Sequence, residues 1–458
     1  STTFAPFTAS FSSRGPLLAS ADLLKPDLIA PGQDIVAAVA PPGNGGLTFN
    51  SYSGTSMSSP HVAGLAALLK DLYPDWSPMA IKSALMTTSG DIRDGANTDP
   101  MVIFRQGAGH VQADLASNPG VVFDSSAIDW FGFLCGTQLD PSFCTSRNIP
   151  VLDPSDFNVA SIAIGELAGV QTVTRRLTNV GNSASTWTSS FTGMDGISVA
   201  VSPASVTIPP GESRPVQVTF TRTTAALNAY TGGQLTWTDG TRTVRIPMVV
   251  RPVALAVPAE VAGTGDPISY PVTFGYTGAF TATPRGLIPA VTTEGDVAQD
   301  PNQAFGDDMA GVVAIPVTIP AGTTYARFSL FDNLVTPPSD LDLYVYRGTT
   351  LVGSSGNAAS NEQVSLLNPP AGDYTVYVHG WEVGGGAALA HFTLFHWLLD
   401  AADAGNMAVT APAAATTGAS GTITLDFTGL TPGVKYLGSV AYGGTAGLPN
   451  PTIVRIDR

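Results

Sequence analysis

The apolar periodicity of the chain changes near residue 160, and this change limits what each part can fold into. Before it, residues 59–73 have apolar side chains at the spacing of one helix face. Ser77 and Pro78 then supply an N-cap and a first helical position for a second helix, and KPDLIAPG (residues 25–32) predicts a short buried strand. After residue 160, short alternating segments are separated by Gly, Pro, Asn and Asp. We therefore predict a mixed fold, with an α/β part built on a parallel sheet followed by several all-β sandwiches.

The length of the chain requires more than one core. For 458 residues, about three or four domains are expected. The predicted division is an α/β segment over residues 1–118, a connecting segment over 119–159, a first β-sandwich over 160–252, a β-sandwich region over 253–400, and a small C-terminal β unit over 401–458.

The charge and composition exclude several classes of partner. The chain has 20 Lys and Arg against 35 Asp and Glu, a formal net charge of −15, which argues against nucleic acid or an anionic membrane as the main partner. No run of about 20 apolar residues indicates a membrane span. The 49 Gly and 36 Pro fit an extracellular, turn-rich protein. The first residues lack the pattern of a signal peptide, so we expect the natural chain to begin upstream of Ser1.

Two cysteines, Cys135 and Cys144, lie nine positions apart in FGFLCGTQLDPSFC. In an oxidising environment they are candidates for a local disulfide, which would contribute about 2–3 kcal/mol to stability. The alternative is a pair of packed free thiols.

The most informative segment is GTSMSSPHVAG, which runs from Gly54 to Gly64. It places Ser56 among small residues at the start of a predicted helix that reaches about Tyr73. The unpaired N–H groups and the positive dipole end of a helix favour the negative charge that develops during acyl transfer. Taken alone, a serine at a helix start is far more often an N-cap than a nucleophile.

The full string resembles the nucleophile signature of the subtilases, and other motifs extend this resemblance to the plant cucumisin-like branch. The matching segments are residues 11–16 (FSSRGP), 25–32 (KPDLIAPG), 54–64, 76–78 (WSP), 81–88 (IKSALMTT), 107–111 (GAGHV), 133–135 (FLC), 177–181 (LTNVG), 237–240 (WTDG) and 244–247 (VRIP). The similarity covers about residues 8–251. It implies a partial subtilisin-like domain followed by a fibronectin type III-like domain. The strands at 339–346 and 372–376 resemble those of bacterial pre-peptidase C-terminal domains.

The resemblance implies a serine endopeptidase that forms an acyl-enzyme on Ser56 and takes peptide or protein substrates. Gly54 and Thr55 would support the oxyanion site. Tyr52 and Ser53 would lie on the leaving-group side of the cleft.

Subtilases also need an Asp, a His and an oxyanion-hole Asn upstream of the serine, and this chain departs from that pattern. Residues 1–55 contain no histidine, and Asp22, Asp27 and Asp34 do not resemble the family's aspartate motif. We expect these groups to come from an N-terminal segment absent from this chain, so the chain alone is expected to be inactive.

Other candidates have structural interpretations that we favour. His61 and His110 match structural positions of the family, and Asn44 is too close in sequence to Ser56 to be the oxyanion donor. No cofactor or metal is required.

In the C-terminal part, the carboxylates of Asp307, Asp308, Asp340 and Asp342 could hold Ca²⁺, but solvated turn carboxylates are the favoured interpretation. Trp381 and Trp397 could contact proteins or glycans, although packing in a sandwich core is the default. The main alternative function is a non-catalytic binding or structural module, or a pseudoenzyme fragment.

Overall fold

The computed structural model describes residues 5–306 and 308–458, which form two compact units. The first unit contains residues up to Ala256, and the second contains nearly all of the remainder. No helix in the described residues is long and apolar enough to cross a membrane.

The N-terminal part of the first unit is mainly helical. Its elements are β1 (Ile35–Ala38), β2 (Phe49–Tyr52), α1 (Thr55–Leu72), α2 (Pro78–Thr87), α3 (Pro100–Gln106), α4 (Ala113–Ala116), α5 (Ala127–Thr137) and α6 (Pro141–Ser146). The side chain of Ser77 accepts from the N–H of Ala80, which confirms the predicted N-cap of α2. Cys135 in α5 and Cys144 in α6 form a disulfide.

Two β-sheets complete this unit. One has the order β4-β11-β10-β6-β8 and the other β3-β5-β9-β7. Their strands are β3 (Val121–Val122), β4 (Ile162–Leu167), β5 (Val170–Asn179), β6 (Ser185–Gly193), β7 (Ile197–Ser202), β8 (Ser205–Ile208), β9 (Ser213–Arg222), β10 (Thr231–Thr238) and β11 (Thr243–Pro252). The short β12 (Leu255–Ala256) follows β11 and belongs to neither of these sheets. Within the first sheet, β4 pairs with β11 in parallel.

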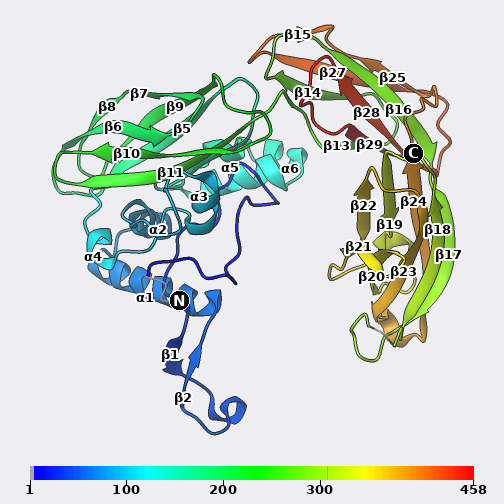
Figure 1. Cartoon of the computed structure of the whole chain (residues 1–458), viewed down its shortest axis with the longest axis horizontal. Helices are drawn as coiled ribbons and strands as arrows, with labels where there is room; N and C mark the ends of the chain where they lie inside the picture. Colours follow the sequence, from blue (N-terminus) through cyan, green and yellow to red (C-terminus); the bar gives the residue numbers. More distant parts are fainter. Residues whose placement is uncertain (1–4, 307) are drawn as a thin grey trace. The chain divides into compact units, whose positions relative to one another are not determined.

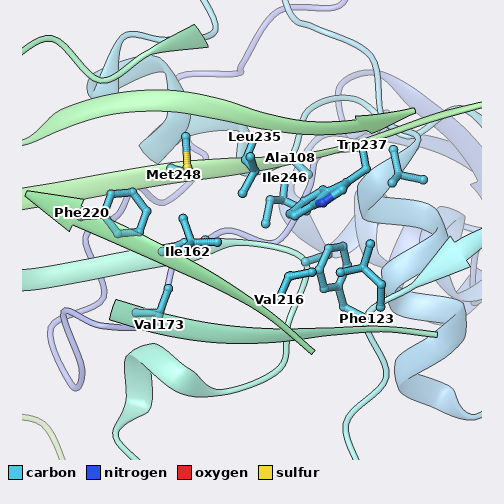
Figure 2. Packing of buried hydrophobic residues seen from close by; sticks show 14 of the residues in the cluster. Ala108, Phe123, Ile162, Val173, Val216, Phe220, Leu235, Trp237, Ile246 and Met248 are labelled. Carbon is cyan, nitrogen blue, oxygen red and sulfur yellow. The ribbon is translucent and has the colours of Figure 1, made fainter. Parts of the chain in front are cut away.

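The hydrophobic core of this sandwich includes residues of the helical part. Trp237, Phe220 and Ile246 are buried between the sheets together with Met86 of α2 and Ala108, and Figure 2 shows this packing around Phe123 and Trp237. In Figure 1, α2 and α3 lie against the side of the sandwich formed by β10 and β11. The helices therefore bury apolar surface on the sandwich, which stabilises both parts.

The mixed fold class is confirmed, but one element of the helical part differs from its prediction. Residues 25–32 do not form a strand. Ile29 alone makes a bridge, parallel to His110, with N–H···O bonds of 2.9 Å from Ile29 to Gly109 and from Val111 to Ile29. Within residues 5–118 the only sheet is the antiparallel hairpin of β1 and β2, so this segment has no adjacent strand with which to pair.

The second unit contains two further β-sandwiches. Its strands are β13 (Glu260–Gly263), β14 (Ile268–Phe274), β15 (Gly278–Ala279), β16 (Thr281–Pro289), β17 (Val291–Ala298), β18 (Val312–Ile319), β19 (Tyr325–Ser329), β20 (Asp340–Arg347), β21 (Thr350–Ser355), β22 (Gln363–Leu367), β23 (Gly372–Glu382), β24 (Leu389–Leu399), β25 (Met407–Thr410), β26 (Ala414–Ala415), β27 (Ser420–Phe427), β28 (Lys435–Gly443) and β29 (Thr452–Asp457).

The pairing of these strands corrects the predicted boundary at residue 400. Strands β13, β14 and β16 pair with β29, β27 and β28, so residues 260–289 and 407–457 form one sandwich. A second sandwich, with sheets β17-β24-β19-β22 and β18-β23-β20-β21, is inserted between them. The separate C-terminal unit predicted over 401–458 was wrong because β27, β28 and β29 pair with strands more than a hundred residues upstream.

We expect loss of the disulfide to destabilise the first unit. Replacing Cys144 by Ser opens a loop closed over nine positions, which should lower the free energy of unfolding by about 2–3 kcal/mol. Thermal unfolding under oxidising conditions would measure this. The double variant Cys135→Ser/Cys144→Ser is the control, since it removes the same bond without leaving a thiol. An unchanged unfolding midpoint in both variants would contradict the expectation.

Candidate active site

Ser56 lies in the first turn of α1, which begins at Thr55 and ends at Leu72. This confirms the predicted helix and its start. Gly54 occupies the N-cap position and provides no side-chain cap, so the first N–H groups of the helix are not covered by a capping side chain. Pro60 lacks the N–H that would pair with the carbonyl of Ser56 in a regular helix. The first turn thus presents the exposed Ser56 beside backbone groups of positive partial charge.

The segment from Ala30 to Gly32 holds this turn in place. The N–H of Gly54 donates to the carbonyl of Gly32 over 2.8 Å, and the Ser58 hydroxyl donates to the carbonyl of Ala30 over 3.0 Å. A Cβ at Gly32 would lie 2.1 Å from Ser58 Oγ and 2.9 Å from the Gly54 carbonyl oxygen. Only glycine allows this approach. The roles of Gly32 and Ser58 were missed at the sequence level, although both lie in the motifs that were singled out.

Tyr52 and Ser53 connect the β1–β2 hairpin to the nucleophile turn. Ser53 Oγ accepts from the N–H of Asp34 over 2.8 Å, and its hydroxyl lies 3.2 Å from Asp34 Oδ1. The Tyr52 hydroxyl donates to the side-chain oxygen of Asn44. Asn44 and Asp34 therefore stabilise the hairpin through these hydrogen bonds.

Neither histidine of the first unit contacts Ser56. Nδ1 of His61 lies 2.8 Å from the carbonyl oxygen of Met57, and Nδ1 of His110 lies 3.0 Å from that of Val111. In residues 5–306 and 308–458, no side chain is hydrogen-bonded to Ser56 Oγ. Within the described residues, no histidine or carboxylate is therefore hydrogen-bonded to the Ser56 hydroxyl.

The remaining candidate aspartates have other partners. Asp22 Oδ1 accepts from the N–H of Gly165 over 2.7 Å. Burial is the largest influence on Asp22 and raises the pKa of its carboxyl. Asp27 forms ion pairs of 2.7 Å with Lys25 and 2.9 Å with Lys82. Both carboxylates connect segments of the fold and do not approach the serine.

Asp27 also makes the stability of the site depend on pH. Burial alone would raise the pKa of its carboxyl, but Lys82 and Lys25 outweigh burial and hold the pKa below its usual value. A carboxyl whose pKa is lower in the folded state stabilises the fold above its unfolded pKa and loses this contribution as the pH falls through the folded pKa.

We therefore expect Asp27→Asn to lower the free energy of unfolding at pH 7 by about 1 kcal/mol, with the difference from the unmodified chain vanishing as the pH falls through the lowered pKa of Asp27. Denaturant unfolding at several pH values measures this. The exposed Asp71→Asn, a change of equal charge in α1, is the control and should have little effect. A pH-independent loss in Asp27→Asn would contradict the role assigned to the ion pairs.

Several large apolar side chains of α1 and of the β1–β2 hairpin are exposed. Leu68 and Leu72 of α1 are 62% and 60% exposed, and Val36 and Phe49 of the hairpin are 70% and 63% exposed. Val62, Leu65 and Leu69, which belong to the same apolar stripe of α1, pack in a core with Ile81 and Leu85 of α2. One edge of this stripe is therefore left exposed.

The two tryptophans singled out in the second unit differ in their exposure. Trp397 is 1% exposed and belongs to the core, as the default interpretation held, whereas Trp381 is 37% exposed. Asp307 lies outside the described residues. Among the residues that are described, no group of three or more His, Cys, Asp or Glu side chains is arranged to hold a metal ion.

Comparison with known proteins finds a different family model for each of the two parts of the first unit. Residues 2–109 match the model of the subtilase family, and residues 156–250 match that of a fibronectin type-III domain. The N-terminal part of this chain is therefore similar to the subtilase family. The fibronectin type-III match covers the sandwich formed by β4 to β11.

Curated relatives agree with this assignment. The chain is 40% identical over 274 residues to subtilisin-like protease SBT5.4 of Arabidopsis thaliana, covering 54% of this chain and 34% of that protein. It is 39% identical over 273 residues to subtilisin-like protease Glyma18g48580 of Glycine max, again covering 54% and 34%. The chain thus spans about a third of the length of these relatives.

Among solved structures, the secreted serine protease VesC from Vibrio cholerae matches with 13% identity and a TM-score of 0.18, over 52% of this chain and 49% of that chain. A TM-score this low supports no conclusion about the fold.

Proposed function

We propose that the natural protein is a subtilisin-like serine endopeptidase in which Ser56 is the nucleophile. The observation that carries this proposal is the position of Ser56, exposed in the first turn of α1 and held by the hydrogen bonds of Gly54 and Ser58. A nucleophile held rigidly at a helix start meets a substrate carbonyl in a defined geometry.

The reaction assigned to this site is acyl transfer. Ser56 Oγ bonds to the carbonyl carbon of the scissile peptide while a base takes the hydroxyl proton. The proton passes to the leaving amine as the C–N bond breaks, which leaves an ester on Ser56. Water then hydrolyses this ester and restores the serine. Thr55 and Gly54 would contribute backbone groups near the developing oxyanion, and Tyr52 and Ser53 would line the leaving-group side.

The base, its orienting Asp and the oxyanion Asn are assigned to an N-terminal segment that is not among these residues. The exposed edge of the apolar stripe of α1 and the exposed Val36 and Phe49 support this assignment, because a polypeptide packed on them would bury that surface. The disulfide between Cys135 and Cys144 supports an extracellular location.

The direct test is hydrolysis of a peptide substrate by the natural, full-length protein. We expect Ser56→Ala to lower kcat by about 10⁴ to 10⁶-fold, because the nucleophile is removed. Ser59→Ala, which truncates an exposed serine in the same helix, is the matched control and should leave kcat unchanged. Equal activity of Ser56→Ala and the unmodified enzyme would rule out the assigned nucleophile, and an inactive natural protein would favour a pseudoenzyme.

The second unit is assigned no part in bond cleavage. Because β11 runs to Pro252 and the first unit reaches Ala256, the full-length protein should be cut after Ala256. We expect the truncated enzyme to retain kcat/KM for a short peptide within about tenfold, which corresponds to roughly 1.4 kcal/mol of transition-state stabilisation. A larger loss in a soluble, folded truncated enzyme would assign the second unit a catalytic role.

A further inference from the structure

The outward face of the sheet β18-β23-β20-β21 in the second unit is rich in tyrosine. Leu343 and Val345 of β20 are buried in the sandwich, so the alternation of the strand turns Tyr344 and Tyr346 outward. On the neighbouring β23, Tyr377 lies opposite Tyr344. The rings of Tyr346 and Tyr377 are nearly perpendicular, with centroids 5.5 Å apart.

A fourth ring lies on this face from a loop. Phe305 stacks on Tyr344 with a centroid distance of 4.0 Å and an interplanar angle of 13°, and its centroid is 5.7 Å from that of Tyr377. Phe305, Tyr344, Tyr346 and Tyr377, here called the aromatic platform, are all partly exposed. Such rings offer flat apolar surfaces that a partner can contact.

The loop that carries Phe305 is anchored by a buried polar group. His379 is fully buried, with Nε2 3.1 Å from Asp300 Oδ2 and Nδ1 3.2 Å from Asp342 Oδ2. Asp300 also accepts from the N–H groups of Asn302 and Ala304. These bonds link the loop to β20 and β23. The backbone before Phe305 is therefore held in place, and the Phe305 side chain loses little conformational freedom when a partner binds.

Carboxylates lie at both ends of the aromatic platform. Asp373 is on β23 beyond Thr375 and accepts from the Thr318 hydroxyl over 2.7 Å, while Asp340 lies opposite Glu382 at the other end. Burial raises the pKa of Asp340, and the nearby charges of Asp342, Glu362 and Glu382 raise it further. The largest charge influences on Asp340 in the described residues thus come from other carboxylates.

Apart from Arg347, there is no Lys or Arg among the described outward positions of the four strands. Arg347 ends β20, is exposed, and its guanidinium donates to the carbonyl of Ala371. The described outward positions therefore combine partly exposed aromatic rings with carboxylates and include no other Lys or Arg.

We propose that the aromatic platform is a docking site for an extended polypeptide segment that carries Lys or Arg side chains. Cations are attracted to the faces of Tyr and Phe rings, and the carboxylates at the two ends are complementary to a basic partner. Anionic polymers are repelled, and a neutral glycan gains nothing from the carboxylates. This binding goes beyond the proposed function, since it requires no catalysis and is measured without it.

The test is calorimetric titration of the 458-residue chain with a decapeptide of alternating Lys and Ala. We expect binding that weakens with added salt. Tyr346→Leu and Tyr377→Leu keep the apolar bulk but remove the ring, and each should weaken binding by about fivefold or more. Tyr346→Phe and Tyr377→Phe keep the ring and should retain affinity. Asp373→Asn should weaken binding by about threefold.

The opposite sheet of the same sandwich provides matched controls. Glu294→Gln on β17 and Leu389→Ala on β24 change exposed side chains and should leave the affinity unchanged. Circular dichroism and thermal unfolding establish that each variant is folded, and Phe305→Leu replaces any tyrosine variant that fails to fold.

Three results would overturn the proposal. The first is no binding of the basic peptide, and the second is equal weakening by Glu294→Gln and Asp373→Asn, which would indicate non-specific attraction to an acidic protein. The third is binding of cellohexaose or chitohexaose that does not depend on salt and that Tyr377→Leu abolishes, while the basic peptide does not bind. This result would assign the aromatic platform to a neutral glycan.

Discussion

The apolar contact between the helices of residues 78–106 and the fibronectin type-III sandwich supports the rest of the first unit. Met86 and Ala108 belong to the same core as Trp187, Trp237 and Phe220, and Ile103 packs with Ala163 and Val249. Residues 5–118 contain no sheet beyond one short hairpin. The helices α2 and α3 therefore bury one side on the sandwich. The hydrogen bonds from Gly54 and Ser58 that hold the first turn of α1 depend on this packing.

The segment of residues 27–32 connects the stability of the first unit to the position of Ser56. The segment with Asp27 is joined to α2 through Lys82 and to the residues before α4 through the N–H of Ala108, which donates to the Asp27 carbonyl over 2.9 Å. A few residues later, the same segment supplies the carbonyls of Ala30 and Gly32 that hold α1. Displacement of this segment would therefore move Ser56 as well as weaken the core.

Local signals predicted the parts of the fold that depend on local interactions. The start of α1 followed from the string around Ser56, and the N-cap Ser77 followed from the Ser-Pro pair. The strand expected over residues 25–32 did not form, since a strand needs a neighbour that local sequence cannot supply. For the same reason the pairing of β14 with β27 and of β16 with β28 was missed, and with it the true extent of the sandwich. The stacking of Phe305 on Tyr344 depends on a loop conformation that no periodicity reveals.

Ser56 is proposed to be a nucleophile whose base lies outside these residues. A fluorophosphonate probe tests this role directly, because labelling requires an activated serine. We expect that the 458-residue chain alone is not labelled, whereas the natural protein is labelled at Ser56, as located by peptide mass spectrometry. Labelling of Ser56 in the chain alone, abolished by Ser56→Ala, would contradict this proposal, as would labelling of the natural protein at a different serine.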